Sequence, residues 1–435
     1  MNKQEFNRGL ADFIDASPTP FHAAQNLLKI FIEAGFEVLQ ESDVWSIRKE
    51  GSYVLTRNQS SLIAFQIGKT PVEEDGLRMV GAHTDSPCLR LKPSPITEER
   101  GYIRLGVEVY GGVLLNPWFD RDLSLAGRVT LKKSDGTLSS RLINFVSPIA
   151  FIPSLAIHLD REANTKRSIN AQTMLPPLVG LASNNPLDIV QLLEKELKRK
   201  KQFRRGDKIL DFELSLYDVQ PVSLLGLDDC FISGARLDNL LSCYTGAISM
   251  TASRTGRAKL LVCNDHEEVG SGSLAGARGN FLRSVIARLS GKEETQARML
   301  SRSLLVSTDN AHGVHPNFPE KHDQHHGPIL NKGPVVKVNN NQAYATNSES
   351  ASILQAMASG ARVKLQSFVS RSDVACGSTI GPLTATELGV RTVDVGVPTF
   401  GMHSIREMAG SNDAWELQKL LKVFYQTNQL QVSAE

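Results

Sequence analysis

The N-terminal region changes from a helical to a strand-like pattern of apolar positions. Helical spacing places Phe6, Leu10, Phe13 and Ile14 on one face, and then Leu27, Leu28, Phe31 and Ile32 on another. Prolines at positions 18 and 20 separate the two predicted helices, and Gly35 ends the second. Short β-rich runs follow at residues 53–56, 61–67 and 78–82, and the last of them delivers His83 at its C-terminal end.

The pattern changes again at about Pro93. Segments such as YIRLGVEVYGGVLL and GRVTLKKSDGTLSSRLINFV alternate, and an SDG turn separates two of the predicted strands. Within the region that begins at Pro93, the first long helix is predicted only at about residues 187–201. We therefore predict that residues 93–228 form a separate, mostly β domain inserted into another one.

After Asp228 helices and strands alternate. The predicted helices cover residues 237–252, 281–289, 348–358 and 380–388, with a last helix from Asp413; the predicted strands cover 258–263, 303–308, 335–338, 363–369 and 392–395. Such alternation is typical of an α/β layer with a mixed or parallel sheet. We therefore assign residues 1–92 and 229–435 to one α/β domain.

Length and composition are those of a globular protein with about two domains. The 435 residues exceed what one hydrophobic core usually organises, and 41% are hydrophobic and 22% charged. A net charge of +2 gives no global attraction to nucleic acid, and no apolar run approaches the roughly 20 residues that span a bilayer. We interpret the basic run KELKRKKQFRR as a solvated helix end, and we expect neither nucleic acid nor a membrane as partner.

Cysteine usage and the N-terminus indicate a cytoplasmic protein. The five cysteines are an odd, widely spaced set without any CxxC, which is typical of reduced thiols. The start MNKQEFNRGL lacks the apolar core of a signal peptide.

Five short stretches place acidic and imidazole side chains next to turn residues: GAHTDSP, RLDNL, NDHEEVGS, STDNAHGVHPN and GMHSIRE. Four of them follow or adjoin a predicted strand, and sites in α/β sheets form beyond the carboxyl ends of strands. Two divalent ions about 3.5–4 Å apart need such a set of ligands. Imidazole suits zinc-like ions, and carboxylates add oxygen ligands.

Each stretch has a plain structural interpretation as well. His83 alone could be a hydrogen-bonded structural histidine, and Asp238 could be a helix N-cap. The doublet Glu267-Glu268 is different, because adjacent carboxylates repel unless a cation or a bound proton compensates. One as a metal ligand and the other as general base would account for the doublet.

The motifs together resemble those of the M18 family of metallopeptidases, the aspartyl aminopeptidases, with the bacterial branch as the best match. GAHTDSP, LDNL, NDHEEVGS, GPVVKVNNNQAYATN, CGSTIGP and GMHSIREM carry the resemblance along essentially the whole chain. It implies a mixed-sheet, zinc-peptidase-like α/β catalytic domain with an inserted dimerisation domain at residues 93–228. It also implies an aminopeptidase that releases N-terminal Asp or Glu by attack of a water activated between two metal ions, zinc by expectation.

The resemblance implies a role for each matching residue. The ligands of the two ions would be His83, Asp238, Glu268, Asp309 and His403, with Asp238 bridging. Asp85 would orient His83, as carboxylates commonly do for ligating histidines, and Glu267 would be the general base.

Three further residues are implied to meet the substrate. Lys337 would bind its acidic side chain with Tyr344 as a neighbour in the pocket, although a lone lysine on a strand is usually just exposed. His158 would reach the active site of a neighbouring subunit, although it could equally be an ordinary surface residue. The family assembles as dodecamers built from dimers, so a homo-oligomer is expected.

Other functions remain open on the residues alone. A two-metal carboxypeptidase or deacylase would use the same ligand set, and a scaffold oligomer could carry a vestigial site. The intact base and full ligand set argue against the scaffold. The histidine-rich stretch from His312 to His326 suggests another metal site, but in the resemblance it is a loop near the active site and not a ligand set.

Overall fold

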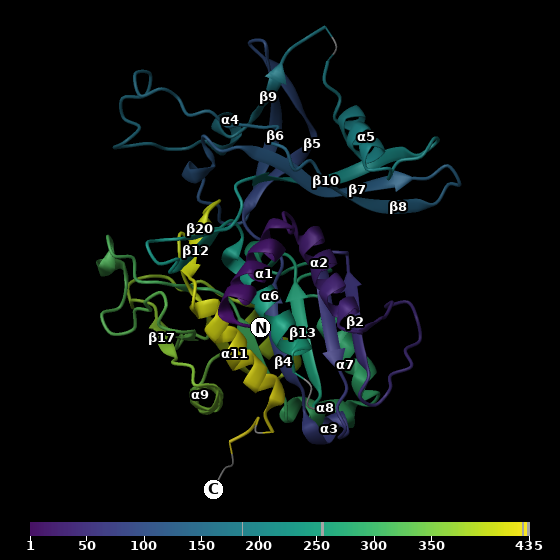
Figure 1. The fold of residues 1–435 in the computed structure, drawn as a ribbon, viewed down its shortest axis with the longest axis vertical. Coiled ribbons are helices and arrows are strands. Elements are labelled where there is room, and N and C mark those ends of the chain that lie inside the picture. Colours follow the sequence, from purple (N-terminus) through teal and green to yellow (C-terminus); the bar gives the residue numbers. More distant parts are fainter. Residues whose placement is uncertain (185, 254–255, 429, 433–435) are drawn as a thin grey trace. The chain divides into compact units, whose positions relative to one another are not determined.

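The computed structural model describes residues 1–184, 186–253, 256–428 and 430–432 (Figure 1). The chain forms two compact units. One, here called the α/β unit, comprises Met1–Asp85, Val222–Met402 and Glu407–Glu435. The other, the β unit, comprises Ser86–Pro221 together with the short segment His403–Arg406.

The main sheet of the α/β unit has nine strands. In the order of the sheet they are β1 (Glu37–Val38), β2 (Ser52–Arg57), β3 (Ser61–Gln66), β13 (Lys259–Asn264), β4 (Arg78–His83), β14 (Leu304–Thr308), β18 (Arg391–Gly396), β16 (Val335–Val338) and β17 (Gln366–Val369). The strands β13, β4, β14 and β18 run parallel, whereas β3 pairs antiparallel with β13 and β16 with β18. The mixed α/β sheet expected from the sequence is confirmed.

The central strands are apolar runs buried on both faces. Every residue of β4, β13 and β14 is buried, as is common for parallel strands covered by helices. Because successive side chains point to opposite faces, Val80 packs in one hydrophobic core and Met79 in the other. Leu261 and Leu260 of the neighbouring strand divide in the same way.

The helices of the α/β unit lie largely where the apolar spacing predicts them. They are α1 (Lys3–Asp15), α2 (Pro20–Glu33), α3 (Val72–Asp75), α6 (Leu237–Thr251), α7 (Phe281–Ser290), α8 (Glu293–Ser301), α9 (Ser348–Ala361), α10 (Ile380–Leu388) and α11 (Asp413–Gln426). A capping box between Asn2 and Glu5 begins α1, and Pro20 begins α2. Helices α3 and α8 were not predicted from the sequence.

A second, five-stranded sheet in this unit was not predicted. Its order is β11 (Ser223–Leu225), β12 (Phe231–Gly234), β20 (Glu407–Gly410), β19 (Pro398–Phe400) and β15 (Ala311–His312). Strands of two to four residues are too short to show a period-2 pattern in the sequence.

The β unit is built on one antiparallel sheet. In sheet order its strands are β8 (Leu138–Asn144), β7 (Leu123–Lys132), β10 (Lys208–Asp218), β5 (Cys88–Glu99), β6 (Tyr102–Tyr110) and β9 (Leu178–Leu181), with helices α4 (Ala171–Met174) and α5 (Ile189–Arg199). Trp118, Leu125 and Leu216 belong to its hydrophobic core. The domain boundary that we placed at Pro93 falls inside β5, because the strand begins at Cys88.

Two smaller expectations are also answered by the structure. Within the basic run, Lys198, Arg199 and Lys200 form ion pairs with glutamates of α5 itself, as expected of a solvated helix end. All five cysteines are free thiols. In the described part of the chain, no helix has the length and apolar character needed to cross a bilayer.

Candidate metal centre

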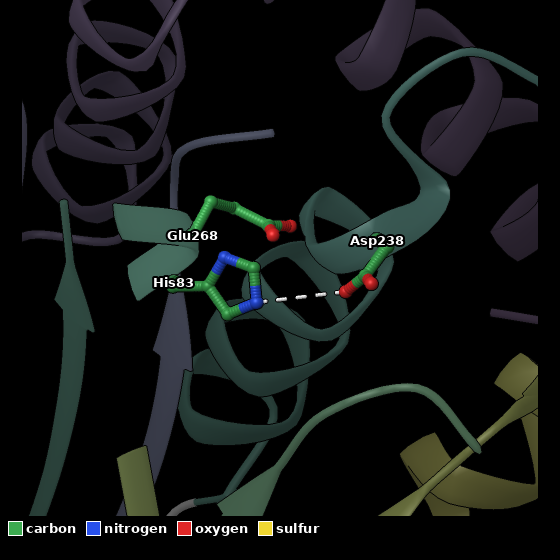
Figure 2. A group of neighbouring side chains, drawn as sticks. All are labelled: His83, Asp238 and Glu268. Carbon is green, nitrogen blue, oxygen red and sulfur yellow. Dashed lines mark ion pairs between the residues drawn. The ribbon is translucent and has the colours of Figure 1, made fainter. Parts of the chain in front are cut away.

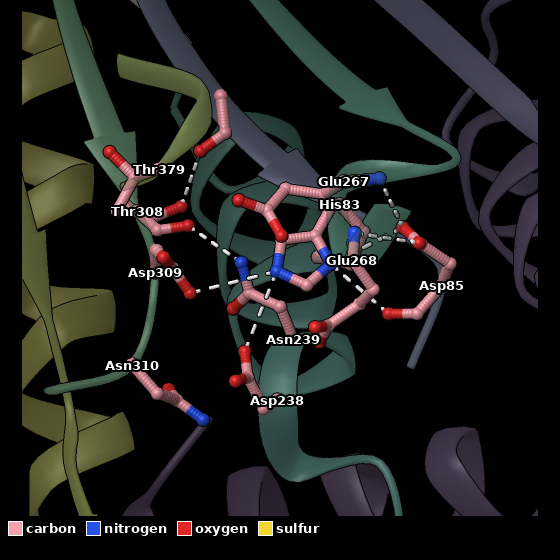
Figure 3. Close-up of polar contacts among 12 residues, drawn as sticks. His83, Asp85, Asp238, Asn239, Glu267, Glu268, Thr308, Asp309, Asn310 and Thr379 are labelled. Carbon is pink, nitrogen blue, oxygen red and sulfur yellow. Dashed lines mark hydrogen bonds and ion pairs between the residues drawn. The ribbon is translucent and has the colours of Figure 1, made fainter. Parts of the chain in front are cut away.

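The predicted chemistry gathers at the carboxyl ends of three adjacent parallel strands (Figure 3). His83 is the last residue of β4 and lies in register with Asn264, the last residue of β13. Glu267 and Glu268 follow β13 in a short 3-10 turn, and Asp309 follows β14 directly. The order β13-β4-β14 therefore brings together side chains that lie far apart in the sequence.

The imidazole of His83 is buried and held at both nitrogens. Its Nδ1 lies 3.0 Å from the carbonyl oxygen of Asp85 and 3.5 Å from the Asp85 carboxylate. Its Nε2 lies 3.5 Å from Asp238 and 3.6 Å from Asp309. Because a carbonyl can only accept, we assign the proton to Nδ1, which leaves Nε2 for a metal when the ring is neutral.

Asp85 fixes the glutamate doublet as well as the histidine. Its two carboxylate oxygens accept hydrogen bonds from the backbone N–H groups of Glu267 and Glu268, each at 3.1 Å. The sequence predicted only the contact with His83. One fully buried carboxylate therefore positions the predicted ligand of one strand and the predicted base of the next.

Asp238 lies in the first turn of α6, buried beside His83. Its backbone N–H donates to Glu407 at 2.9 Å, and the neighbouring Asn239 donates its side-chain N–H to the carbonyl of Thr308 at 2.8 Å. The backbone angles of Asp238 and Asn239 are non-helical, so α6 is kinked at these two residues, and Arg236 at its N-cap position makes no side-chain capping bond.

His83, Asp238 and Glu268 converge as a possible metal site (Figure 2). One potential ligand atom from each lies within 4.8 Å of the others. Among the residues that the structure describes, they form the single group of three or more such side chains. The histidine-rich stretch from His312 to His326 thus forms no comparable group.

The electrostatics of this group favour a cation. Burial, against the opposing effect of His83 and together with the negative charges of Asp309, Asp85 and Asp238, raises the pKa of Glu267 to about 8. Burial and the charge of Asp238 raise the pKa of Glu268 well above its usual range. Burial lowers the pKa of His83, but hydrogen bonding to the surrounding aspartates more than offsets this and raises it. A divalent ion would supply the positive charge that balances these carboxylates, and the nitrogen and oxygen donors fit zinc.

Asp309 links this group to Lys337. One carboxylate oxygen faces His83, and the other lies 3.3 Å from the Lys337 ammonium. Burial opposes ionisation of Asp309, but the charge of Lys337, together with the hydrogen bond to His83 and the charge of His83, outweighs it and lowers the pKa of the carboxyl. Lys337 is itself buried on β16, with its ammonium 5.0 Å from the ring centroid of Tyr344. The interpretation of Lys337 as an ordinary exposed lysine is therefore wrong.

Two predicted residues belong to the β unit instead. His403 lies there with its Nδ1 3.0 Å from the carbonyl oxygen of Gly112. His158 is exposed on a turn, between the exposed side chains of Ile157 and Leu159.

The structure adds residues that the sequence analysis did not select. Glu407 and Asn239 hold α6 against the site, and Asn310 follows Asp309 with a buried side chain. A hollow of about 320 Å³ also opens beside Tyr344; its lining includes His312, His315, Phe368, Arg371 and Phe400. The density of histidines in this stretch was the available signal, although it marks a pocket wall and not a ligand set.

A buried imidazole among carboxylates at the strand ends of a mixed α/β sheet defines the class of metal-dependent hydrolases. The family model described as "Aminopeptidase I zinc metalloprotease (M18)" matches residues 13–425. The chain therefore belongs to the M18 family of zinc metalloproteases, and it is a metalloaminopeptidase, a peptide hydrolase.

Individual relatives agree along nearly the whole chain. The "Probable M18 family aminopeptidase 2" of Pseudomonas savastanoi pv. phaseolicola (strain 1448A / Race 6) is 54% identical over 98% of this chain and 100% of its own length. The matching chain in the cryo-EM structure of the Ape4 and Nbr1 complex superposes with a TM-score of 0.93 at 40% identity, covering 98% of this chain and 86% of that one. The S. cerevesiae mApe1 dodecamer has a TM-score of 0.85 at 28% identity, over 98% of both chains.

Proposed function

We propose that this aminopeptidase releases N-terminal Asp and Glu residues with the help of two divalent ions, zinc in the native enzyme. The observation that carries the proposal is the group formed by the buried His83 and Asp238 with the half-buried Glu268, beside which Asp85 holds Glu267. We assign Asp309 and His403 as the remaining ligands. Asp238 would be the ligand shared by the two ions, which is the role that the resemblance to M18 enzymes implies for it.

The protein's own residues perform the proton transfer. Zinc supplies Lewis acidity to a carbonyl oxygen and to water. Glu267 takes the proton of the attacking water and passes it to the leaving amine. This requires the ionised carboxylate, and bound cations would lower its pKa by compensating the negative charges around it.

Lys337 and Tyr344 supply the preference for an acidic side chain. An ammonium has three donors, and those of Lys337 already meet Asp309 at 3.3 Å and the carbonyl of Asn310 at 3.1 Å. One N–H is left for a substrate carboxylate. The ring centroid of Tyr344 lies 5.0 Å from this ammonium, and Tyr344 also lines the hollow that His312 lines.

We further propose a cytoplasmic homo-oligomer, a dodecamer built from dimers, in which the β unit is the dimerisation domain. The structural neighbour mApe1 is a dodecamer, and the β unit exposes Leu155, Ile157 and Leu159 around His158. Such an apolar group is typical of a surface that meets another protein. His158 would then extend into the active site of the neighbouring subunit. Five free thiols fit a reducing compartment.

A panel of aminoacyl p-nitroanilides tests the proposal on the zinc-reconstituted enzyme. We expect Asp and Glu derivatives to be cleaved with the highest kcat/KM, and N-acetylated derivatives not at all. A preference for blocked amines or for free C-terminal carboxylates would instead favour a deacylase or a carboxypeptidase. Elemental analysis of the same sample should give two metal ions per chain.

A further inference from the structure

Asn310 carries a buried carboxamide with no hydrogen-bond partner at either end. The residue is 2% exposed, and neither its Oδ1 nor its Nδ2 has a partner within the described ranges. Buried amides without partners destabilise a fold, so native proteins contain few of them. Those that persist call for an explanation, and a functional site is a common one.

Other buried carboxamides of this unit behave differently. Asn239, also beside the metal centre, has no partner for its Oδ1 among the described residues, but its Nδ2 donates to the carbonyl of Thr308 at 2.8 Å. Asn7 of α1 is 4% exposed and donates to the carbonyl of Ser411 at 2.9 Å. Asn310 therefore differs in hydrogen bonding, although not in burial.

The main chain of Asn310 is fixed next to Lys337. The N–H groups of Asp309 and Ala311 donate to the carbonyls of Val395 and Val397 at 3.1 and 2.9 Å. The carbonyl of Asn310 itself accepts from the Lys337 ammonium at 3.1 Å. In Figure 3 the side chains of Asp309 and Asn310 both leave the chain on the side where His83 and Asp238 lie.

We infer that the Asn310 carboxamide binds the substrate, donating its N–H to the side-chain carboxylate of an N-terminal Asp or Glu. This rests on the proposed acidic preference. A carboxylate can accept about four hydrogen bonds, and Lys337 has one N–H left for it. The site is otherwise rich in negative charge, so a substrate carboxylate needs more donors. An amide adds one without the repulsion that a further carboxylate would bring.

Replacing Asn310 should therefore affect activity without lowering the stability of the fold. Replacing Asn310 with alanine removes a group that has no partner in the free enzyme, so the fold should not suffer. The same change removes a donor from the bound substrate. A charge-assisted hydrogen bond of this kind corresponds to roughly a 10- to 100-fold change in kcat/KM.

The experiment compares Asn310→Ala, Asn310→Asp and the matched control Asn7→Ala. The Tm is measured on metal-free protein, zinc content on reconstituted protein, and kcat/KM on Asp, Glu and Leu p-nitroanilides. For Asn310→Ala we expect an unchanged or raised Tm, full zinc content, and a loss confined to the acidic substrates. Asn310→Asp should lose more on those substrates, because it places a negative charge against the substrate carboxylate. Asn7→Ala should lower the Tm and leave the ratio of acidic to Leu activity unchanged.

Three results would overturn the inference. A fall in Tm for Asn310→Ala as large as that for Asn7→Ala would make the amide a structural group. Reduced zinc content would make it a metal ligand, and equal losses on Asp, Glu and Leu substrates would remove it from side-chain recognition. If the wild type itself shows no acidic preference, the proposed function fails together with the inference. If the preference is present and Lys337→Ala abolishes it while Asn310→Ala does not, the inference alone fails.

Discussion

In the α/β unit, acidic and imidazole side chains at the strand ends are buried and paired, whereas one segment of the β unit leaves large apolar side chains in solvent. His83 is 1% exposed and Asp85 0%, each held by neighbours. In the β unit, Leu155 is 58% and Leu159 75% exposed. Single exposed apolar residues also occur in the α/β unit, as in most proteins, but the β unit gathers several in the stretch around His158.

The difference indicates that the two units bind different partners. Burying several carboxylates is unfavourable unless cations and hydrogen bonds compensate for their negative charge. In the α/β unit negative charge is in excess around His83, and a bound metal ion would balance it. Exposing an apolar segment is unfavourable unless another surface covers it. We therefore expect the α/β unit to bind metal ions and the exposed apolar segment of the β unit to bind another protein chain.

The largest expected effect comes from removing the base in the α/β unit. Glu267→Gln keeps the shape of the side chain and its backbone bond to Asp85, but it cannot take a proton. We expect zinc content to stay at the wild-type level and kcat to fall by at least about 10²-fold. Elemental analysis beside a rate assay decides the matter, and a mutant with the wild-type rate would exclude Glu267 as the base.

The second prediction concerns one residue from each unit, His158 of the β unit and Glu267 of the α/β unit. If His158 acts in a neighbouring subunit, His158→Ala and Glu267→Gln should complement each other when mixed and reassembled. A working site needs the intact Glu267 of a His158→Ala chain and the intact His158 of a neighbouring Glu267→Gln chain. Equal random mixing therefore restores about one quarter of the sites, provided that each site receives its histidine from one neighbour.

The control for this experiment is each mutant reassembled alone. Native mass spectrometry must show that the mixed assemblies contain both chains. Mixed assemblies that stay as inactive as the two parents would place His158 outside the neighbouring site.

Much of the α/β unit could be predicted because its signals are local. The apolar run that ends at His83 makes β4, and the spacing of apolar residues makes α1, α2 and α11. The sequence also placed His83, Asp238 and Glu268 among the candidate ligands, and the structure brings these three side chains together.

What could not be predicted depends on contacts between distant segments. The bonds from the N–H groups of Glu267 and Glu268 to Asp85 join residues more than 180 positions apart, and no local pattern signals them. The five-stranded sheet is made of strands too short to show a period. No local pattern signalled the burial of Lys337, because only the folded chain brings Asp309 within 3.3 Å of it.

The third prediction concerns specificity within the α/β unit. Lys337→Ala should lower kcat/KM for Asp and Glu substrates by about 10- to 100-fold, the range for one charge-assisted contact. The Leu substrate is the internal control, since it has no carboxylate to bind. Because Lys337 also pairs with Asp309, zinc content should be measured on the same sample. Equal losses on all three substrates would assign Lys337 to the metal centre and not to specificity.

The smallest expected effect is a pH dependence of stability that differs between metal-free variants. The pKa of Glu267 is about 8 in the folded metal-free protein, against an ordinary value of 4.5. A carboxyl whose folded pKa is raised stabilises the fold most below its unfolded pKa, and this contribution is lost as the pH rises through the folded pKa. The Tm of the metal-free protein should therefore decrease between about pH 5 and pH 8, and the decrease should be smaller in Glu267→Gln.

Asp413 provides the comparison for this last measurement. Burial raises its pKa to about 7, from 3.8, against the opposing hydrogen bonds from the backbone N–H groups of Asn331 and Gly333. The sign is the same, so Asp413→Asn should also reduce the decrease in Tm. Asp413 is not among the predicted metal ligands, so its effect should persist when zinc is bound, whereas that of Glu267 should disappear because bound cations would hold it ionised. If zinc leaves both effects unchanged, the carboxylate group around His83 does not bind the metal.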